Sequence, residues 1–172
     1  MVALNDLDRD ARTQLWREVL GQYPTGVAIV SALDPAGQPQ GLVVGTFSSV
    51  SMDPPLISYM PQRTSRAYAA IIEAERFQVS ILCAAQEEFC RTFAKSEPNR
   101  RFERGSWVTN EHGVPRLTDC VVWFDCVRAS TTEVGDHDFV LGRVEDLGFG
   151  NGDPRHALLF YQGGYGSAAF VD

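Results

Sequence analysis

The feature that most constrains the fold of this chain is a series of short apolar segments joined by turn residues. Residues 26–33 are rich in β-branched side chains, residues 34–37 read Asp-Pro-Ala-Gly, and apolar residues resume after Gly41. Proline and glycine in that order suit a tight turn, so the sequence predicts a β-hairpin here. Residues 56–60 and the long stretch 120–147 have a similar composition and predict further antiparallel strands.

The segment at 76–82, which reads Arg-Phe-Gln-Val-Ser-Ile-Leu, alternates apolar with polar side chains. A period of two is typical of a strand with one buried face, because successive side chains of a strand point to opposite faces. The pattern therefore predicts a half-buried strand with Gln78 and Ser80 on its polar face.

Three segments have the composition and spacing of helices. Asp6 or Asp8 is expected to cap the first, whose apolar residues fall on one face. That face is formed by Leu15, Trp16, Val19, Leu20 and Tyr23. Thr64 or Ser65 is expected to cap a second helix, and a third is expected at about residues 86–95.

Short strands, tight turns and few helices together predict a mainly β protein, an antiparallel Greek-key barrel with helices over its ends. The polar stretch 96–115 is expected to be a loop. No repeat, low-complexity tract or linker divides the chain, and its 172 residues suit one folding unit. We therefore expect a single domain over residues 1–172.

The composition argues against several kinds of partner. A net charge of −7 disfavours nucleic acid and anionic membranes, since both require a basic face. No apolar run approaches the ~20 residues that span a bilayer, and the N-terminal residues do not resemble a secretory leader. The 4 cysteines form no Cys-x-x-Cys pair and the 3 histidines are scattered, so no metal site is expected. We expect buried, reduced thiols in a cytoplasmic protein.

The stretch that begins at Gly45 and reads Gly-Thr-Phe-Ser-Ser-Val-Ser-Met holds many small hydroxyls in a region of strand character. In one interpretation these side chains satisfy their own backbone at a frayed strand end. In the other, Ser49 and Ser51 donate to a phosphate together with the start of the second helix, which offers Thr64, Ser65, Arg63 and Arg66. The alternative for the two arginines is a solvated helix face. Gly45 favours the second interpretation, because glycine within a strand often marks the close approach of a ligand.

Six segments of the chain follow one another in a characteristic order. They are 23–32 (YPTGVAIVSA), 41–56 (GLVVGTFSSVSMDPPL), 63–71 (RTSRAYAAI), 76–82 (RFQVSIL), 135–144 (GDHDFVLGRV) and 158–166 (LLFYQGGYG). In this order they resemble the flavin reductase family, the reductase partners of two-component monooxygenases, which fold as FMN-binding split barrels. The resemblance covers nearly the whole chain.

The resemblance implies an antiparallel split β-barrel enzyme that binds FMN (or FAD), takes a hydride from NADH or NADPH and passes reduced flavin to a separate monooxygenase. It also implies a homodimer with flavin near the subunit interface. The flavin carries the chemistry, so neither a catalytic residue nor a metal is implied. The implied flavin-binding positions are Thr25, Val43, Val44, Gly45, Thr46, Ser49, Val50, Ser51, Ser65, Arg66 and Ser80. The implied nicotinamide-binding positions are His137, Phe102 and Tyr165.

Departures from the family pattern leave alternatives open. Ala67 stands where a second phosphate-binding threonine is frequent, which favours weak, exchangeable flavin; a flavoprotein that retains its cofactor is the alternative. A barrel that binds another planar ligand, such as haem, is a third hypothesis, which the hydroxyl-rich segments disfavour. A histidine flanked by carboxylates in a hairpin turn is the alternative for His137. Arg100, Arg101 and Arg104 either form a solvated loop face or meet dinucleotide phosphates.

Overall fold

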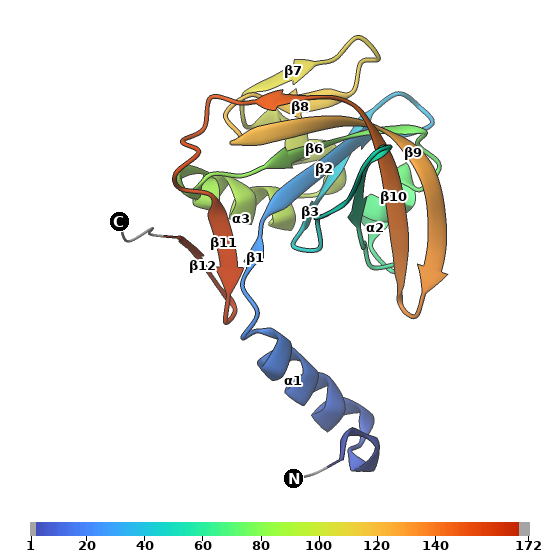
Figure 1. The fold of residues 1–172 in the computed structure, drawn as a ribbon, viewed down its shortest axis with the longest axis vertical. Helices are drawn as coiled ribbons and strands as arrows, with labels where there is room; N and C mark the ends of the chain where they lie inside the picture. Colours follow the sequence, from blue (N-terminus) through green and yellow to red (C-terminus); the bar gives the residue numbers. More distant parts are fainter. Residues whose placement is uncertain (1–2, 169–172) are drawn as a thin grey trace.

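The computed structural model of the protein describes residues 3–168 and contains three antiparallel β-sheets (Figure 1). The seven-stranded sheet has the order β3-β2-β6-β9-β10-β5-β4. Its strands are β2 (Ala28–Leu33), β3 (Pro39–Val44), β4 (Ser48–Met52), β5 (Pro55–Tyr59), β6 (Arg76–Ile81), β9 (Val122–Val134) and β10 (His137–Phe149). The smaller sheets contain β1 (Thr25–Gly26), β11 (Leu158–Tyr161) and β12 (Gly164–Ser167), and β7 (Trp107–Thr109) and β8 (Pro115–Leu117).

Helices α2 (Arg66–Ile71), α3 (Glu87–Lys95) and η3 (Pro98–Glu103) pack against β3. The other helices are η1 (Leu4–Asp6), α1 (Arg9–Leu20) and η2 (Ala84–Gln86). The caps expected from the sequence are present: Asp8 accepts a hydrogen bond from the Ala11 N–H and Ser65 accepts one from the Tyr68 N–H. No helix among residues 3–168 is long and apolar enough to cross a membrane.

The first hairpin forms where the sequence predicts it. β2 and β3 pair from Ala28 with Val44 to Leu33 with Pro39. The Asp34 carboxylate accepts hydrogen bonds from the N–H groups of Ala36 and Gln38, which holds the turn.

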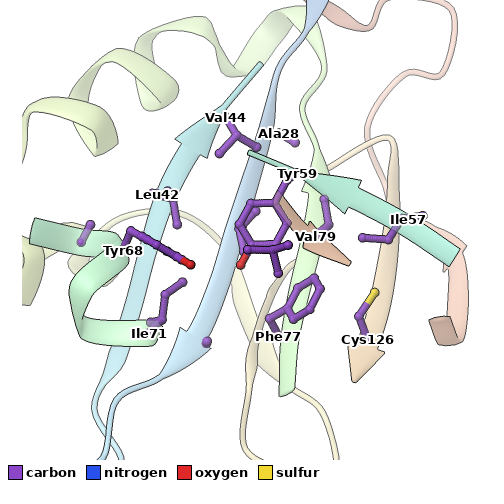
Figure 2. Close-up of a cluster of buried hydrophobic side chains, with 14 of the residues drawn as sticks. Ala28, Leu42, Val44, Ile57, Tyr59, Tyr68, Ile71, Phe77, Val79 and Cys126 are labelled. Carbon is purple, nitrogen blue, oxygen red and sulfur yellow. The ribbon is translucent and has the colours of Figure 1, made fainter. Parts of the chain in front are cut away.

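The seven-stranded sheet curls until strands near its opposite edges share one core. β3 is first and β5 sixth in the strand order, yet Val44 of β3 and Tyr59 of β5 belong to the same buried cluster (Figure 2). Tyr68 and Ile71 of α2 also belong to that cluster, so this short helix packs onto the apolar interior. The prediction of a mainly β, antiparallel barrel with flanking helices is confirmed.

β6 corrects one prediction, because both of its faces are buried. Gln78 is 0% and Ser80 is 1% exposed. The face that was expected to be polar is covered by a second apolar cluster that includes Ile29, Leu82 and Phe93. A strand in the middle of a covered sheet is buried whatever its alternation, so the prediction of a half-buried strand is wrong.

The stretch 96–115, expected to be a loop, contains two ordered elements. η3 packs against β3, and β7 pairs with β8. The Phe102 ring of η3 lies 4.6 Å from the Trp107 ring of β7, centroid to centroid. Aromatic packing therefore orders a segment whose composition is polar.

α1 forms as predicted but buries none of its side chains. It extends away from the barrel (Figure 1). Its C-terminal end is attached to the β11–β12 turn, where Gln162 donates to Gln22 at 2.7 Å. The apolar side chains that share one face of this helix are exposed in the single chain; Trp16 is 56% and Val19 is 58% exposed.

Candidate functional site

A groove of about 340 Å³ opens where β3 leaves the sheet. We call it the strand-end groove. It is lined by Leu42, Val43, Val44, Gly45, Thr46, Met60, Pro61, Gln62, Ser65, Ala94, Arg101 and His137. The structure thus brings together several predicted site residues that lie far apart in the sequence, namely Val43, Val44, Gly45, Thr46, Ser65 and His137.

β3 presents backbone groups to this groove. It is an edge strand of the seven-stranded sheet, and β2 is its neighbour there. The Gly41 carbonyl points away from β2, because it accepts a hydrogen bond from Arg101. Alternate residues of an antiparallel strand direct their backbone groups to the same side, so the N–H and C=O of Val43 also point off the edge. A flat ligand lying along β3 can therefore form hydrogen bonds with the Val43 backbone.

The hydroxyl of Thr46 closes one end of the groove. Its oxygen accepts from the Met60 N–H at 2.9 Å and donates to the Met60 carbonyl at 3.1 Å. These bonds join the chain after β3 to the chain after β5. Because the hydroxyl is already engaged, Thr46 offers a ligand chiefly its backbone.

Gly45 lies close to a neighbouring side chain as well as beside the open groove. A Cβ at this position would lie 2.8 Å from the Thr25 hydroxyl oxygen, which is too close for an unbonded pair. Close ligand approach, the interpretation drawn from the sequence, is therefore one of two reasons for the glycine. The other is that it makes room for Thr25.

The wall opposite β3 is built from two segments that are hydrogen-bonded to each other. The Arg63 N–H donates to the Asp136 carbonyl at 3.0 Å, and the Asp138 N–H donates to the Pro61 carbonyl at 3.1 Å. The buried Asp138 carboxylate also accepts a 2.8 Å hydrogen bond from the Tyr68 hydroxyl of α2. These contacts hold the chain around Ser65 beside the β9–β10 turn.

His137 stands at the β9–β10 turn with its side chain partly exposed. Its Nδ1 lies 2.7 Å from the Asp136 carboxylate, and this hydrogen bond lowers the pKa of Asp136 below its ordinary value. The carboxylate orients the ring and leaves Nε2 for a ligand. Both interpretations of His137 are thus compatible with its position, since it is a turn histidine beside a carboxylate and also lines the groove.

Arg101 gives the groove a fixed positive charge. Its guanidinium donates to the carbonyls of Gly41, Ser96 and Ala94, and among residues 3–168 it has no ion pair with a carboxylate. Burial lowers the pKa of Arg101, the nearby Glu97 carboxylate opposes this shift, and Arg66 adds to it. Two arginine side chains therefore act near one end of the groove, which suits an anion.

The sequence offered Arg101 only as one member of an arginine-rich loop, so it was missed as a groove residue. The signal that could have identified it is its position beside Phe102, which anchors η3 in the aromatic cluster.

Ser65 can still donate to a ligand. Its hydroxyl oxygen accepts a hydrogen bond from the Tyr68 N–H at 3.3 Å, so its own proton remains available.

A second groove of about 160 Å³ lies on the other side of the β3 end. It is lined by Thr25, Val27, Val43, Val44, Gly45, Phe160 and Tyr165. Burial raises the pKa of the Tyr165 hydroxyl to about 12, and the Arg91 guanidinium lies 4.6 Å from the centre of its ring. Thr25 and Tyr165 therefore meet each other across this groove and do not line the strand-end groove.

The remaining predicted residues lie outside both grooves. Ser49, Val50 and Ser51 are on β4, which runs away from the groove as Ser51 pairs with Leu56. Ser80 is enclosed in the core near the Cys120 thiol.

Three further positions also have surroundings that the sequence did not indicate. Phe102 packs against Phe93 and Trp107 in the aromatic cluster. Arg66 is exposed beside the groove, and Ala67 is buried in the core. A side chain at position 67 therefore faces the apolar interior, and the phosphate argument drawn from Ala67 loses its basis.

Residues 3–168 contain no cluster of three or more His, Cys, Asp or Glu side chains arranged to hold a metal ion. The four cysteines Cys83, Cys90, Cys120 and Cys126 are buried and unpaired. Burial raises the pKa of Cys126 to about 12, so this thiol stays protonated at neutral pH.

Comparison with known proteins places these features in one family. Residues 20–169 match the flavin reductase like domain. The chain is 41% identical over 158 residues to a flavin reductase of Pseudomonas putida, covering 92% of this chain and 91% of that one. Nitrilotriacetate monooxygenase component B from Mycobacterium thermoresistibile shares the fold with a TM-score of 0.87 and 31% identity, over 94% of this chain and 89% of that one.

A Streptomyces globisporus structure, the NADH:FAD oxidoreductase SgcE6 in complex with NAD and FAD fragments, is also similar. It has a TM-score of 0.81 and 30% identity over 96% of each chain.

Proposed function

The chain belongs to the flavin reductase family, and we propose that its strand-end groove is where it reduces flavin with a hydride from NADH or NADPH. The observation that carries this assignment is that one groove has a strand edge at one end and hydrogen-bond donors with a positive charge at the other. One end is the edge of β3, where the Val43 backbone is available to hydrogen-bond a flat ring. The other end holds the Ser65 hydroxyl and the Arg101 guanidinium, which suit a phosphate.

The groove fits a flavin mononucleotide in size and chemistry. Its volume of about 340 Å³ lies within the usual range of ligand sites. Val43 and Gly45 supply backbone groups at the ring end, Ser65 and Arg101 supply donors at the phosphate end, and Arg66 adds a second positive charge. When bound, the flavin supplies the ring atom that accepts the hydride. The protein's part is to position the flavin ring against the nicotinamide, so no acid–base residue is assigned.

We assign the nicotinamide side to His137 and Tyr165. His137 faces the strand-end groove, and Tyr165 faces the second groove across Val43 and Gly45. Phe102 is assigned a supporting role, since its ring packs in the aromatic cluster beside the Arg101 backbone.

A homodimer is part of the same proposal. Trp16, Val19 and Leu20 on α1 are all exposed in the single chain, and a helix with an apolar stripe normally buries it. A second copy would cover this stripe. The edge strand β4 is equally exposed, and in a dimer its Ser49 and Ser51 would gain neighbours that the single chain lacks. Light scattering of the purified protein tests this, and a mass of 19.0 kDa would refute the dimer.

We further propose that reduced flavin leaves this chain for a separate monooxygenase. The open groove supports exchange, because a retained cofactor is normally enclosed on most of its surface. A cytoplasmic location belongs to the same proposal and is supported by the four unpaired cysteines. A flavoprotein that retains its cofactor is the competing hypothesis.

Anaerobic bleaching of free FMN or FAD by NADH or NADPH tests the function directly. The protein is kept far below the flavin concentration, and the loss of blue absorption is followed. We expect many equivalents of flavin to be bleached per protein chain. Bleaching of one equivalent would favour the retained cofactor, and no bleaching with either donor would refute the reductase.

A further inference from the structure

A side pocket of about 230 Å³ lies next to the strand-end groove. It is lined by Phe89, Thr92, Phe93, Ser96, Glu97, Arg100, Arg101, Glu103 and Arg104. Arg101 lines both the side pocket and the strand-end groove, so the two cavities adjoin at this side chain. A ligand that passes Arg101 can therefore occupy both.

The charges of the side pocket are unequally compensated. Arg100 is paired with Glu103 at 3.2 Å. Arg101 is held by backbone carbonyls, and Arg104 forms no ion pair within the part of the chain that the structure describes. Glu97 also lines the pocket and lies near enough to act on Arg101. Three arginines and two glutamates therefore line the pocket and leave a small net positive charge, which favours a ligand with phosphate groups.

The inner wall of the side pocket is apolar and aromatic. The half-buried Phe89 packs 5.8 Å from Phe93, centroid to centroid, and its ring is part of the pocket surface. The Thr92 hydroxyl adds a polar group on the same wall. The pocket is smaller than the ~300–1,000 Å³ of a complete ligand site, so it suits one portion of a larger ligand.

We propose that the side pocket binds the adenosine monophosphate half of FAD, while the flavin mononucleotide half lies in the strand-end groove. The diphosphate crosses from one to the other at Arg101, and Arg104 contacts the adenylate phosphate. The adenine lies against Phe89. This inference rests on the proposed function and deepens it, because it makes FAD the preferred flavin and leaves FMN as a substrate that fills only the groove.

Isothermal titration of the anaerobic or aerobic protein with FAD and with FMN tests the assignment. We expect FAD to bind at least about ten-fold more tightly than FMN, because only FAD gains the charge-assisted contacts of the side pocket. Arg104→Ala should weaken FAD about ten-fold and leave FMN within about two-fold. Its side chain is exposed and makes no described hydrogen bond, so the variant should fold. Arg155→Ala, which removes an exposed arginine in another loop, is the matched control and should change neither affinity.

Three outcomes would overturn the inference. Equal affinities of the wild-type protein for FAD and FMN would leave the side pocket without a role in flavin binding. An equal loss of both affinities in Arg104→Ala would place Arg104 at the flavin mononucleotide half. ADP that competes with NADH but not with FAD would assign the pocket to the nicotinamide dinucleotide. The proposed function survives each of these, since it fails only if no flavin is bleached by NADH or NADPH.

Discussion

The two edge strands of the seven-stranded sheet, β3 and β4, differ in what surrounds them. At β3, Arg101 contacts the free edge and the groove opens beside Val43. At β4 the edge is bare, and Met52 is 93% exposed. β3 contains Gly41 and no hydroxyl side chain, whereas β4 contains Ser48, Ser49 and Ser51. The difference shows that a strand rich in hydroxyls is not by itself a binding wall, because the groove forms where other elements face the strand edge.

The largest expected effect is on flavin affinity, and it comes from a carboxylate introduced at the phosphate end of the strand-end groove. Ser65→Asp keeps a good helix cap, because aspartate is as effective as serine at that position. It also places a negative charge where the flavin phosphate is proposed to bind. A repulsion of about 3–4 kcal/mol corresponds to a loss of flavin affinity of a few hundred-fold. Isothermal titration with FMN measures it.

Ser51→Asp on β4 is the matched control for Ser65→Asp. Since Ser51 lies outside the strand-end groove, the flavin affinity of the Ser51→Asp variant should stay within about three-fold of wild type. An equal loss of flavin affinity in both variants would contradict the proposal that β3 lines the flavin site and β4 does not. It would place Ser51 in the site, through the second copy of the chain.

Thr46→Val removes the two hydrogen bonds that join the chain after β3 to Met60. The free energy of unfolding should fall by about 1–2 kcal/mol, as measured by urea denaturation. Ser48→Ala is the counterpart at β4, where the hydroxyl contacts only the neighbouring Ser49 carbonyl. It should change stability by less than about 0.5 kcal/mol. Equal effects would mean that the Thr46 hydrogen bonds to Met60 add no stability.

His137→Ala should raise the KM for NADH about five-fold and leave flavin affinity nearly unchanged, as expected for one lost hydrogen bond. His156→Ala is the control, because His156 also lies beside a carboxylate, that of Asp153, but does not line the strand-end groove. Loss of flavin affinity without a change in KM would instead place His137 on the flavin side.

The same variant carries a pH signature at Asp136. The pKa of Asp136 is lowered chiefly by its hydrogen bond to His137, so this contribution to stability is present above the ordinary pKa of aspartate and is lost as the pH falls. Removal of the imidazole should raise the pKa of Asp136 toward its ordinary value in an NMR titration of the carboxyl carbon. No change would contradict the contact.

Gly45→Ala should have the smallest effect, because the Thr25 side chain can rotate away from the new methyl group. We expect a loss of about 1 kcal/mol in unfolding free energy. The double variant with Thr25→Ala should recover most of it, since the close contact is then removed. Gly166→Ala, where a Cβ would meet nothing within 4 Å, is the control. Failure of the double variant to recover would assign Gly45 to the ligand alone.

Predictions that depended on local chemistry were confirmed. The Asp34 turn, the Ser65 cap and the helical spacing of α1 involve residues within a few positions of one another, so their physics is visible in the sequence. The burial of Gln78 was not visible, because it depends on a second cluster formed by residues distant in the chain. The exposure of Trp16 was likewise not visible, since a stripe of apolar side chains does not say what covers it.

The candidate site shows the same division. The motifs around Val43, Ser65 and His137 could be found in the sequence, and the structure brings all three to one groove. Arg101 could not be selected from its neighbours, because its role depends on the carbonyls that hold it. Ser51 was selected by type, and its distance from the groove depends on the direction of β4.

The sequence by itself determined the class of this protein. The order of its turns, its strand segments and its motifs specifies an antiparallel barrel of the flavin reductase family, because local backbone preferences and residue types act over short distances. Only the tertiary structure decided which hydroxyls and which arginine face the groove. That choice depends on the curl of the sheet, which brings strands near its two edges together in space.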